Sequence, residues 1–361
     1  MTTLTSKRPL WLFFTAALLS IGWFAVPFAS QDDNVGFLLI TSDRAHPSPL
    51  GRCSNCEDIY LMPPEPDPDG TKAIRLTDGG GDPSDSAAYN SSAGDWSNTK
   101  ELIAFHSNRL DRLLQIFLMN PDGTGQRPLV ILPRGAAFAS FSHNGNALCF
   151  HSQTMPSRDI YTVNIDGTAL TNLTSPARVP GEDGANGDNL RCDWSPKGNA
   201  IAFTSSRDSV DGVQNDEIYV MNSDGTNLAR LTTAKGSDAN PAFSPKGDLI
   251  AFESNRDTEP DALVSNAEIY VMHSDGSSQK RLTFFSDEPN PSNINVTKPT
   301  WSPKGDRISF HRRVLGPAGV GKVGHLEVYT MNADGTDLKQ ITSTPPPGFS
   351  GFPSWGKWSA R

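Results

Sequence analysis

Three histidines stand at equivalent positions of a repeated pattern, and they are the first candidates for metal binding or acid–base chemistry. His106, His151 and His311 each follow a phenylalanine near the end of an apolar run. A zinc ion needs every ligand atom within about 2 Å, whereas neighbouring strands lie about 4.8 Å apart. If the three runs belong to sheets arranged around an axis, His311 is too distant to share one ion with the others. We therefore expect no metal site, and we expect the histidines to be satisfied at the surface or between sheets.

The four cysteines form one close pair and two separate residues. Cys53 and Cys56 lie in "CSNC", a spacing that favours a local disulfide in an exported chain. A structural metal site would need a second ligand pair of similar spacing, and the sequence has none. Cys149 and Cys192 lie within strand-like runs, where we expect buried free thiols, with a bridge between them as the alternative.

Acidic residues gather in two connecting segments, "SSRDSVDGVQNDE" and "SNRDTEPDALVSNAE", each with four acidic residues and one arginine. We expect internal pairs of Arg207 with Glu217 and of Arg256 with Glu268. The remaining acid predicts contact with a cationic partner surface or divalent ions, and the alternative is a solvated rim that aids solubility. No cofactor is expected, calcium at these loops being the alternative. The predicted partner-binding residues are Asp208, Asp211, Asp257, Glu259 and Asp261.

A supersecondary unit is repeated six times along the chain. Each copy contains an Asp-Gly, and the glycines of these pairs are Gly70, Gly123, Gly167, Gly225, Gly276 and Gly335. The best copies contain a strand that ends in an aromatic residue, an "SPKG" turn, an "AIAFTS" strand, an "EIYVMN" strand and a short strand after the Asp-Gly hairpin. Four short antiparallel strands repeated at this length predict a propeller blade.

The two ends of the chain each contain part of a unit. "VGFLLITSDR" aligns with the second strand of the unit, whereas "GFPSWGKWSAR" aligns with the first strand. Together they complete one blade, so residues 31–361 predict an all-β, six-bladed β-propeller of four-stranded blades, closed by the C-terminal strand. The aromatic residues of the first strands are expected to pack between blades. They are Trp96, Phe141, Trp194, Phe243, Trp301 and Trp355.

Residues 1–30 have the composition of a targeting segment. Lys7 and Arg8 precede an uncharged stretch over 10–30, which predicts either a cleaved signal peptide or an uncleaved anchor, because about 20 apolar residues can span a bilayer. In both cases the remainder is exported, periplasmic or secreted. The net charge of −9 argues against nucleic acid as a partner, since phosphate binding requires clustered Lys and Arg.

The repeated words "W/F-S-P-x-G", "IAF-x-S-x-R-D" and "IYVMN-x-DG-T" resemble the TolB-like propeller repeat over residues 35–359. We expect a non-catalytic, monomeric propeller that binds a protein or cell-envelope component through its long loops, similar to the TolB propeller. The α/β domain that precedes the TolB propeller has no counterpart, so a full Tol–Pal role is not implied. The repeat also occurs in polysaccharide lyases, and the alternative is an enzyme that uses histidines and a cation at the channel mouth. No G-x-S-x-G motif is present, and no catalytic residue is expected.

Overall fold

A computed structural model describes the chain over residues 36–43, 57–67, 71–79, 89–97, 99–153, 158–174, 187–209, 215–258, 266–287, 295–314, 325–343 and 349–356. The predicted targeting segment (1–30), Cys53 and Cys56 lie outside the described residues, as do Asp211, Glu259 and Asp261. Within the described ranges, no helix has the length and apolar character needed to cross a membrane. The helical element found there is a short 3-10 turn, Phe285–Asp287.

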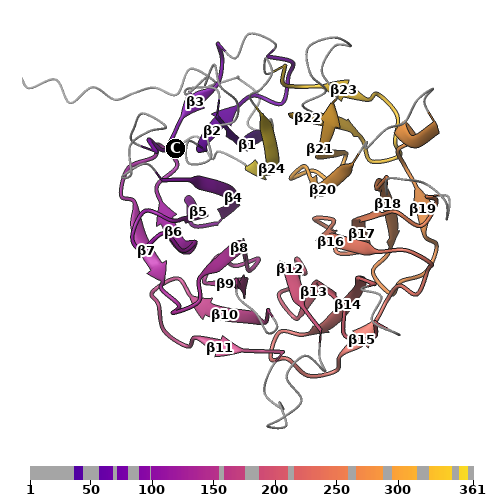
Figure 1. The fold of residues 1–361 in the computed structure, drawn as a ribbon, viewed down its shortest axis with the longest axis horizontal. Coiled ribbons are helices and arrows are strands. Elements are labelled where there is room, and N and C mark those ends of the chain that lie inside the picture. Colours follow the sequence, from indigo (N-terminus) through magenta and orange to yellow (C-terminus); the bar gives the residue numbers. More distant parts are fainter. Residues whose placement is uncertain are drawn as a thin grey trace, which may run out of the picture.

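Six sheets of four antiparallel strands surround a central axis, as predicted (Figure 1). From the axis outward, blade 1 contains β24 (Ser350–Gly356), β1 (Phe37–Ser42), β2 (Asp58–Met62) and β3 (Ile74–Arg75). Blade 2 contains β4 (Ser91–Ser97), β5 (Leu102–Ser107), β6 (Gln115–Met119) and β7 (Arg127–Val130). Blade 3 contains β8 (Ala136–Phe141), β9 (Ala147–Ser152), β10 (Ile160–Asn164) and β11 (Thr171–Asn172). Blade 4 contains β12 (Asn189–Trp194), β13 (Ala200–Ser205), β14 (Glu217–Asn222) and β15 (Ala229–Arg230). Blade 5 contains β16 (Asp238–Phe243), β17 (Leu249–Ser254), β18 (Glu268–His273) and β19 (Lys280–Arg281). Blade 6 contains β20 (Val296–Trp301), β21 (Arg307–Val314), β22 (His325–Asn332) and β23 (Lys339–Gln340).

The C-terminal strand closes the ring, which confirms the prediction from the two incomplete units. β24 pairs antiparallel with β1, and Trp355 lies opposite Leu38. The Phe349 amide donates a 2.7 Å hydrogen bond to Asp43, which extends the junction beyond the strands. Gly356 fits closely against blade 2, since a Cβ there would lie 2.5 Å from the Trp96 ring. The junction is therefore held at both ends of β24.

The second strand of each blade is buried on both faces, because a neighbouring blade covers each side. In β13, every residue from Ile201 to Ser205 is buried, and the residues from Ile201 to Phe203 form a continuous apolar run instead of alternating with polar ones. The innermost aromatic residues pack between blades as predicted. Trp96, for example, shares a core cluster with Leu39 and Ile59 of blade 1 and with Phe105 of its own blade.

A disulfide joins two neighbouring blades. Cys149 of β9 in blade 3 is bonded to Cys192 of β12 in blade 4, with 6.2 Å between their Cα atoms. The expectation of two free thiols is therefore wrong, and the alternative is correct. The two residues are 43 positions apart in sequence, but the second strand of one blade packs against the innermost strand of the next. This packing brings both side chains into one core cluster.

Candidate functional site at the channel wall

Every innermost strand contains a bulge at its third residue. In β12, for example, the register to β13 shifts between Leu190 and Asp193. The residue at the bulge has a positive φ between 49° and 56° in all six blades, although none is glycine. This conformation is unfavourable for L-residues. Because it recurs in all six blades, the bulge is a regular structural feature of the innermost strands, which form the channel wall. The six residues, called the bulge ring below, are Ala93, Phe138, Arg191, Asn240, Lys298 and Phe352.

Each bulge is held by a hydrogen bond from its backbone N–H to a side chain of the preceding blade. The acceptor always occupies the same position of the second strand. It directly follows a buried residue, which is a phenylalanine in blades 2 to 6 and Ile40 in blade 1. The six acceptors are Thr41 (2.9 Å), His106 (3.3 Å), His151 (3.3 Å), Thr204 (3.0 Å), Glu253 (2.9 Å) and His311 (3.1 Å). These bonds link all six blades in one circuit around the channel.

The three candidate histidines therefore connect blades, which confirms their expected place between sheets. Each accepts the bulge N–H at Nδ1, which requires a neutral imidazole. Burial and the nearby charges of Lys298 and Arg191 lower the pKa of His106 and of His311 to about 3, and burial and Arg191 also lower the pKa of His151. Among the described side chains, no group of three or more His, Cys, Asp or Glu residues has the arrangement of a metal site.

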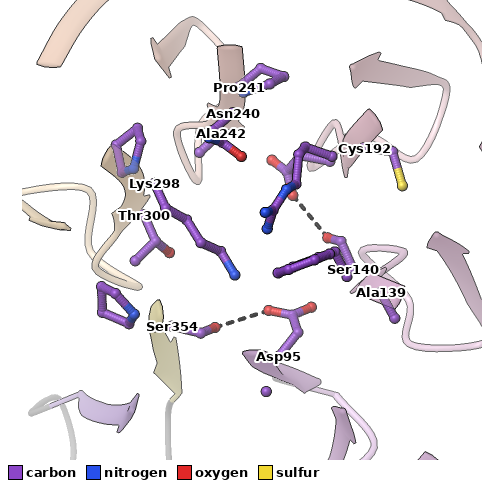
Figure 2. A pocket seen from close by; sticks show the side chains of 16 residues that line it. Asp95, Ala139, Ser140, Cys192, Asn240, Pro241, Ala242, Lys298, Thr300 and Ser354 are labelled. Atoms are coloured by element: carbon purple, nitrogen blue, oxygen red, sulfur yellow. Dashed lines mark hydrogen bonds between the residues drawn. The ribbon is translucent and has the colours of Figure 1, made fainter. Parts of the chain in front are cut away.

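Two aspartates tie the innermost strands together two residues beyond the bulge. Asp95 accepts hydrogen bonds from the Phe141 amide (2.8 Å) of blade 3 and the Ser354 hydroxyl (3.0 Å) of blade 1. Asp193 does the same with the Phe243 amide (2.7 Å) of blade 5 and the Ser140 hydroxyl (2.9 Å) of blade 3. Figure 2 marks the two hydroxyl contacts, at Ser354 and at Ser140, with dashed lines. Burial raises the pKa of Asp95, and it raises that of Asp193 to about 7.

Two cations belong to the bulge ring and line the same pocket. Figure 2 shows the Lys298 side chain extending from β20 toward the centre of the channel. The Lys298 Nζ lies 5.3 Å from the ring centres of both Phe138 and Phe352, and the Arg191 guanidinium lies 3.2 Å from the Phe138 ring centre. Desolvation and the neighbouring Arg191 lower the pKa of Lys298 to about 7, whereas desolvation lowers that of Arg191 to about 10.

The two described residues of the predicted acidic sector lie beside basic residues at the outer part of blades 4 and 5. Asp208 accepts a hydrogen bond from the Tyr219 hydroxyl and lies 3.4 Å from Arg230. Asp257 has the same relation to Tyr270, and it lies 3.3 Å from Arg281. Each of these two carboxylates thus has a cationic neighbour within its own blade.

The prediction that Arg207 pairs with Glu217 and Arg256 with Glu268 is wrong. Glu217 pairs with Arg230 at 2.6 Å, and Glu268 pairs with Arg281 at 3.1 Å. Arg256 instead pairs with Asp238 at 2.7 Å, and the equivalent Arg207 donates to Asn189 at 2.7 Å. The reason is that β15 and β19 place an arginine directly beside the third strand, whereas the loop arginines reach across the second strand to the innermost one.

Sequence reasoning missed Arg191 and Lys298 as site residues. A signal was available, because both stand three positions before the innermost-strand aromatic residue, in "RCDW" and "KPTW". The equivalent positions hold Ala93, Phe138, Asn240 and Phe352, so the charges interrupt an otherwise uncharged position. The bulge that turns this position to the channel was not evident from residue types.

Comparison with known proteins agrees with this geometry. Residues 180–344 match the family model described as the TolB beta propeller domain, PD40. The chain forms a TolB-like propeller. The structure of TolB from Acinetobacter baumannii is 18% identical with a TM-score of 0.64, and the match covers 90% of this chain and 68% of that one. The putative TolB from Agrobacterium tumefaciens is also 18% identical with a TM-score of 0.56, covering 88% of this chain and 97% of that one. A chain of a nidogen/laminin complex is 11% identical with a TM-score of 0.57, covering 88% and 98%. At these identities the similarity of the solved structures concerns the fold.

Proposed function

We propose that this TolB-like propeller is a non-catalytic, exported, monomeric protein that binds a protein partner or cell-envelope component at the end of the channel where each innermost strand begins. The observation that carries the proposal is the bulge ring. Its six members share one backbone conformation and one type of hydrogen bond. Their side chains nevertheless range from alanine to phenylalanine, asparagine, lysine and arginine. A constant scaffold that presents varied side chains is suited to recognition.

The position of the bulge ring favours this end of the channel. Each innermost strand begins after a connection from the outermost strand of the preceding blade, and the bulge is its third residue. In β12, Arg191 therefore precedes Asp193 and the aromatic Trp194 on the way to the opposite face. In five of the six blades the channel-facing side chain of the ring is half-buried, which leaves it accessible to a ligand that enters the mouth.

Export is supported by two features. The disulfide between Cys149 and Cys192 is typical of proteins in oxidising compartments, and residues 1–30 have the composition of a secretory segment. The histidines on which a cation-dependent enzyme would rely hold adjacent blades together instead. This role favours binding over the lyase-like alternative.

The acidic sector remains a second proposed contact. Asp208 and Asp257 already lie beside arginines, so a cationic partner would gain little attraction from these two carboxylates. Their side chains are about half exposed, at 49% and 48%, and surface pairs of this kind contribute about 0–1 kcal/mol. We therefore rank this sector below the channel mouth as the principal contact.

The proposed function can be tested by identifying the partner and reconstituting the complex from purified proteins. Proteins cross-linked to the purified chain in envelope extract would be identified by mass spectrometry, expressed separately and titrated by calorimetry. We expect a saturable complex that Asn240→Phe weakens at least tenfold, because the larger side chain narrows the mouth. Phe138 and Phe352 show that the bulge accommodates phenylalanine.

Lys197→Met is the matched control, since Lys197 is an exposed residue of an "SPKG" turn on the opposite face. It should leave the affinity unchanged, and both variants should melt within a few degrees of the wild type. A complex whose affinity is the same for Asn240→Phe and the wild type would contradict binding at this mouth.

A further inference from the structure

Arg191 and Lys298 stand out within the channel because neither cation has a carboxylate within ion-pair distance among the described residues. The Arg191 Nη1 atom is buried and has no hydrogen-bond partner there. Buried polar atoms are normally hydrogen-bonded, and partly desolvated charges normally have an opposite charge beside them. We propose that Arg191 and Lys298 form a carboxylate-binding site that receives an acidic side chain or the C-terminus of the partner. This inference rests on the proposed function and names the chemistry that the partner supplies.

The carboxylates of the channel are already engaged by other donors. Asp95 and Asp193 each accept one amide and one hydroxyl hydrogen bond from neighbouring blades. Glu253 accepts the backbone N–H of Lys298 at 2.9 Å, so its contact is with the main chain of this residue and not with its ammonium group. These three acids attract the cations over a longer range, but they leave the guanidinium and ammonium donors without a direct acceptor.

The aromatic members of the bulge ring determine how the cations are presented. The Phe138 ring lies against the guanidinium of Arg191, and both Phe138 and Phe352 lie near the Lys298 ammonium. Cation–π contact stabilises each cation over a ring face, and the N–H groups of a stacked guanidinium point outward from its edge. A planar carboxylate matches that edge with two parallel hydrogen bonds. An apolar group beside the carboxylate would pack on Phe352.

The charges around the site give binding a defined dependence on pH. Between pH 8 and pH 6, Lys298 gains its proton and Asp193 becomes protonated, because the pKa of each is about 7. Both changes make the channel more positive and should strengthen carboxylate binding. Arg191 stays charged because its pKa is about 10. The pKa values of Asp95 and Glu253 are raised. The three interblade histidines stay neutral because their pKa values are lowered; they are His106, His151 and His311.

The direct probe is benzoate, which combines a carboxylate with an aromatic ring, and benzamide is its neutral twin. Calorimetry or ligand-detected NMR on the intact chain should show saturable binding of benzoate that competes with acetate and is at least threefold tighter at pH 6 than at pH 8. Benzamide should bind at least tenfold more weakly. Equal binding of benzamide and benzoate, or no saturable benzoate binding, would overturn the site.

Variants assign the effect to the two side chains. Arg191→Met and Lys298→Met should each reduce benzoate affinity at least tenfold, whereas the exposed control Lys197→Met should not. If Arg191→Met does not fold, Lys298→Met and the pH dependence carry the test. Unchanged benzoate affinity in Lys298→Met would contradict the proposal.

Peptides separate the two sources of the carboxylate, and the comparison with partner binding separates the two proposals. N-acetyl-phenylalanine with a free C-terminus represents a chain end, and N-acetyl-Phe-Asp-amide represents an acidic side chain. Tighter binding of one assigns the source, and failure of both would contradict the site. If Lys298→Met loses benzoate binding but keeps its affinity for the partner, the site does not bind the partner's carboxylate, and the proposed function still holds. If the chain binds benzoate but no partner can be found, the proposed function fails, and the carboxylate-binding site still holds.

Discussion

The inner wall and the outer part of blades 4 and 5 use charged residues in opposite ways. At the outer part, Arg230 lies between Glu217 and Asp208, and Arg281 repeats this arrangement one blade later. These two carboxylates and their arginine belong to one blade in each case, and Arg281 also pairs with Asp287 of the following 3-10 turn at 3.1 Å. At the inner wall, the side chains contact neighbouring blades, and Arg191 and Lys298 have no paired carboxylate among the described residues. Charges satisfied within a blade stabilise the fold, whereas charges left at the wall are available to a ligand.

The largest expected effect comes from removing part of the inner wall. Deleting Phe352–Arg361 would remove the bulge, Trp355 and most of the pairing between β24 and β1. It would also leave His311 without the Phe352 N–H. We expect aggregation or the loss of most of the folding free energy, which is about 5–15 kcal/mol in ordinary domains. A chain that ends after Gly356 retains β24 and is the control. A wild-type melting temperature in the longer deletion would contradict closure of the ring by β24.

The next effect concerns the covalent link between blades 3 and 4. The double variant Cys149→Ala, Cys192→Ala should lose about 4 kcal/mol, the value expected for a bridge that closes a loop of this length. Urea unfolding measures the change. Thiol titration of unreduced, denatured protein should find Cys149 and Cys192 unreactive, and peptide mapping would test the same prediction for Cys53 and Cys56. Modification of Cys149 or Cys192 without reduction would contradict the link.

The interblade histidines should make the wild type sensitive to acid. In the folded chain the pKa of His106 and of His311 is about 3, compared with about 6.5 in an unfolded chain. The unfolded state therefore binds more protons between these values, and stability falls as the pH decreases through this range. The predicted slope is about 1.4 kcal/mol per pH unit for each histidine.

Blades 1 and 4 suggest the variant that tests this slope, because Thr41 and Thr204 provide the same acceptor without a titratable group. His106→Thr with His311→Thr should reduce the loss between pH 6 and pH 5 by about 2.4 kcal/mol. Asp193 acts in the opposite direction between about pH 4 and 7, since its pKa is raised, but it is common to both proteins. Equal slopes in urea unfolding would contradict the assigned role of the histidines.

The smallest effect is expected at the outer acids. Asp208→Asn and Asp257→Asn should each change stability by less than about 1 kcal/mol, because these half-exposed carboxylates are screened by solvent. A loss several times larger would show that the outer networks stabilise the fold as strongly as the wall does. The five-residue change of Asp208, Asp211, Asp257, Glu259 and Asp261 to Asn or Gln should leave most partner affinity in place.

The fold was predictable because its signals are local and repeated. The Asp-Gly hairpins, the "SPKG" turns and the unmatched ends determine the number of blades and the closing strand. The link between Cys149 and Cys192 and the true partners of Glu217 depend on which strands meet between or within blades, which spacing alone does not show. The bulge is harder still, because Ala93 or Phe138 has no intrinsic preference for a positive φ. The channel cations therefore became apparent only from the three-dimensional structure.

We propose that the inner wall, through Arg191 and Lys298, holds the partner. A photo-reactive phenylalanine derivative in place of Phe352 would report contacts at the channel mouth, because this member of the bulge ring is already a phenylalanine and lies near Lys298. The same group at the exposed outer position 228 would serve as the control. After irradiation of envelopes that contain the protein, we expect one discrete adduct from position 352, none from position 228, and loss of the adduct when Lys298→Met is introduced. An adduct at position 228 alone, or one at position 352 that persists in Lys298→Met, would contradict binding of the partner at the inner wall.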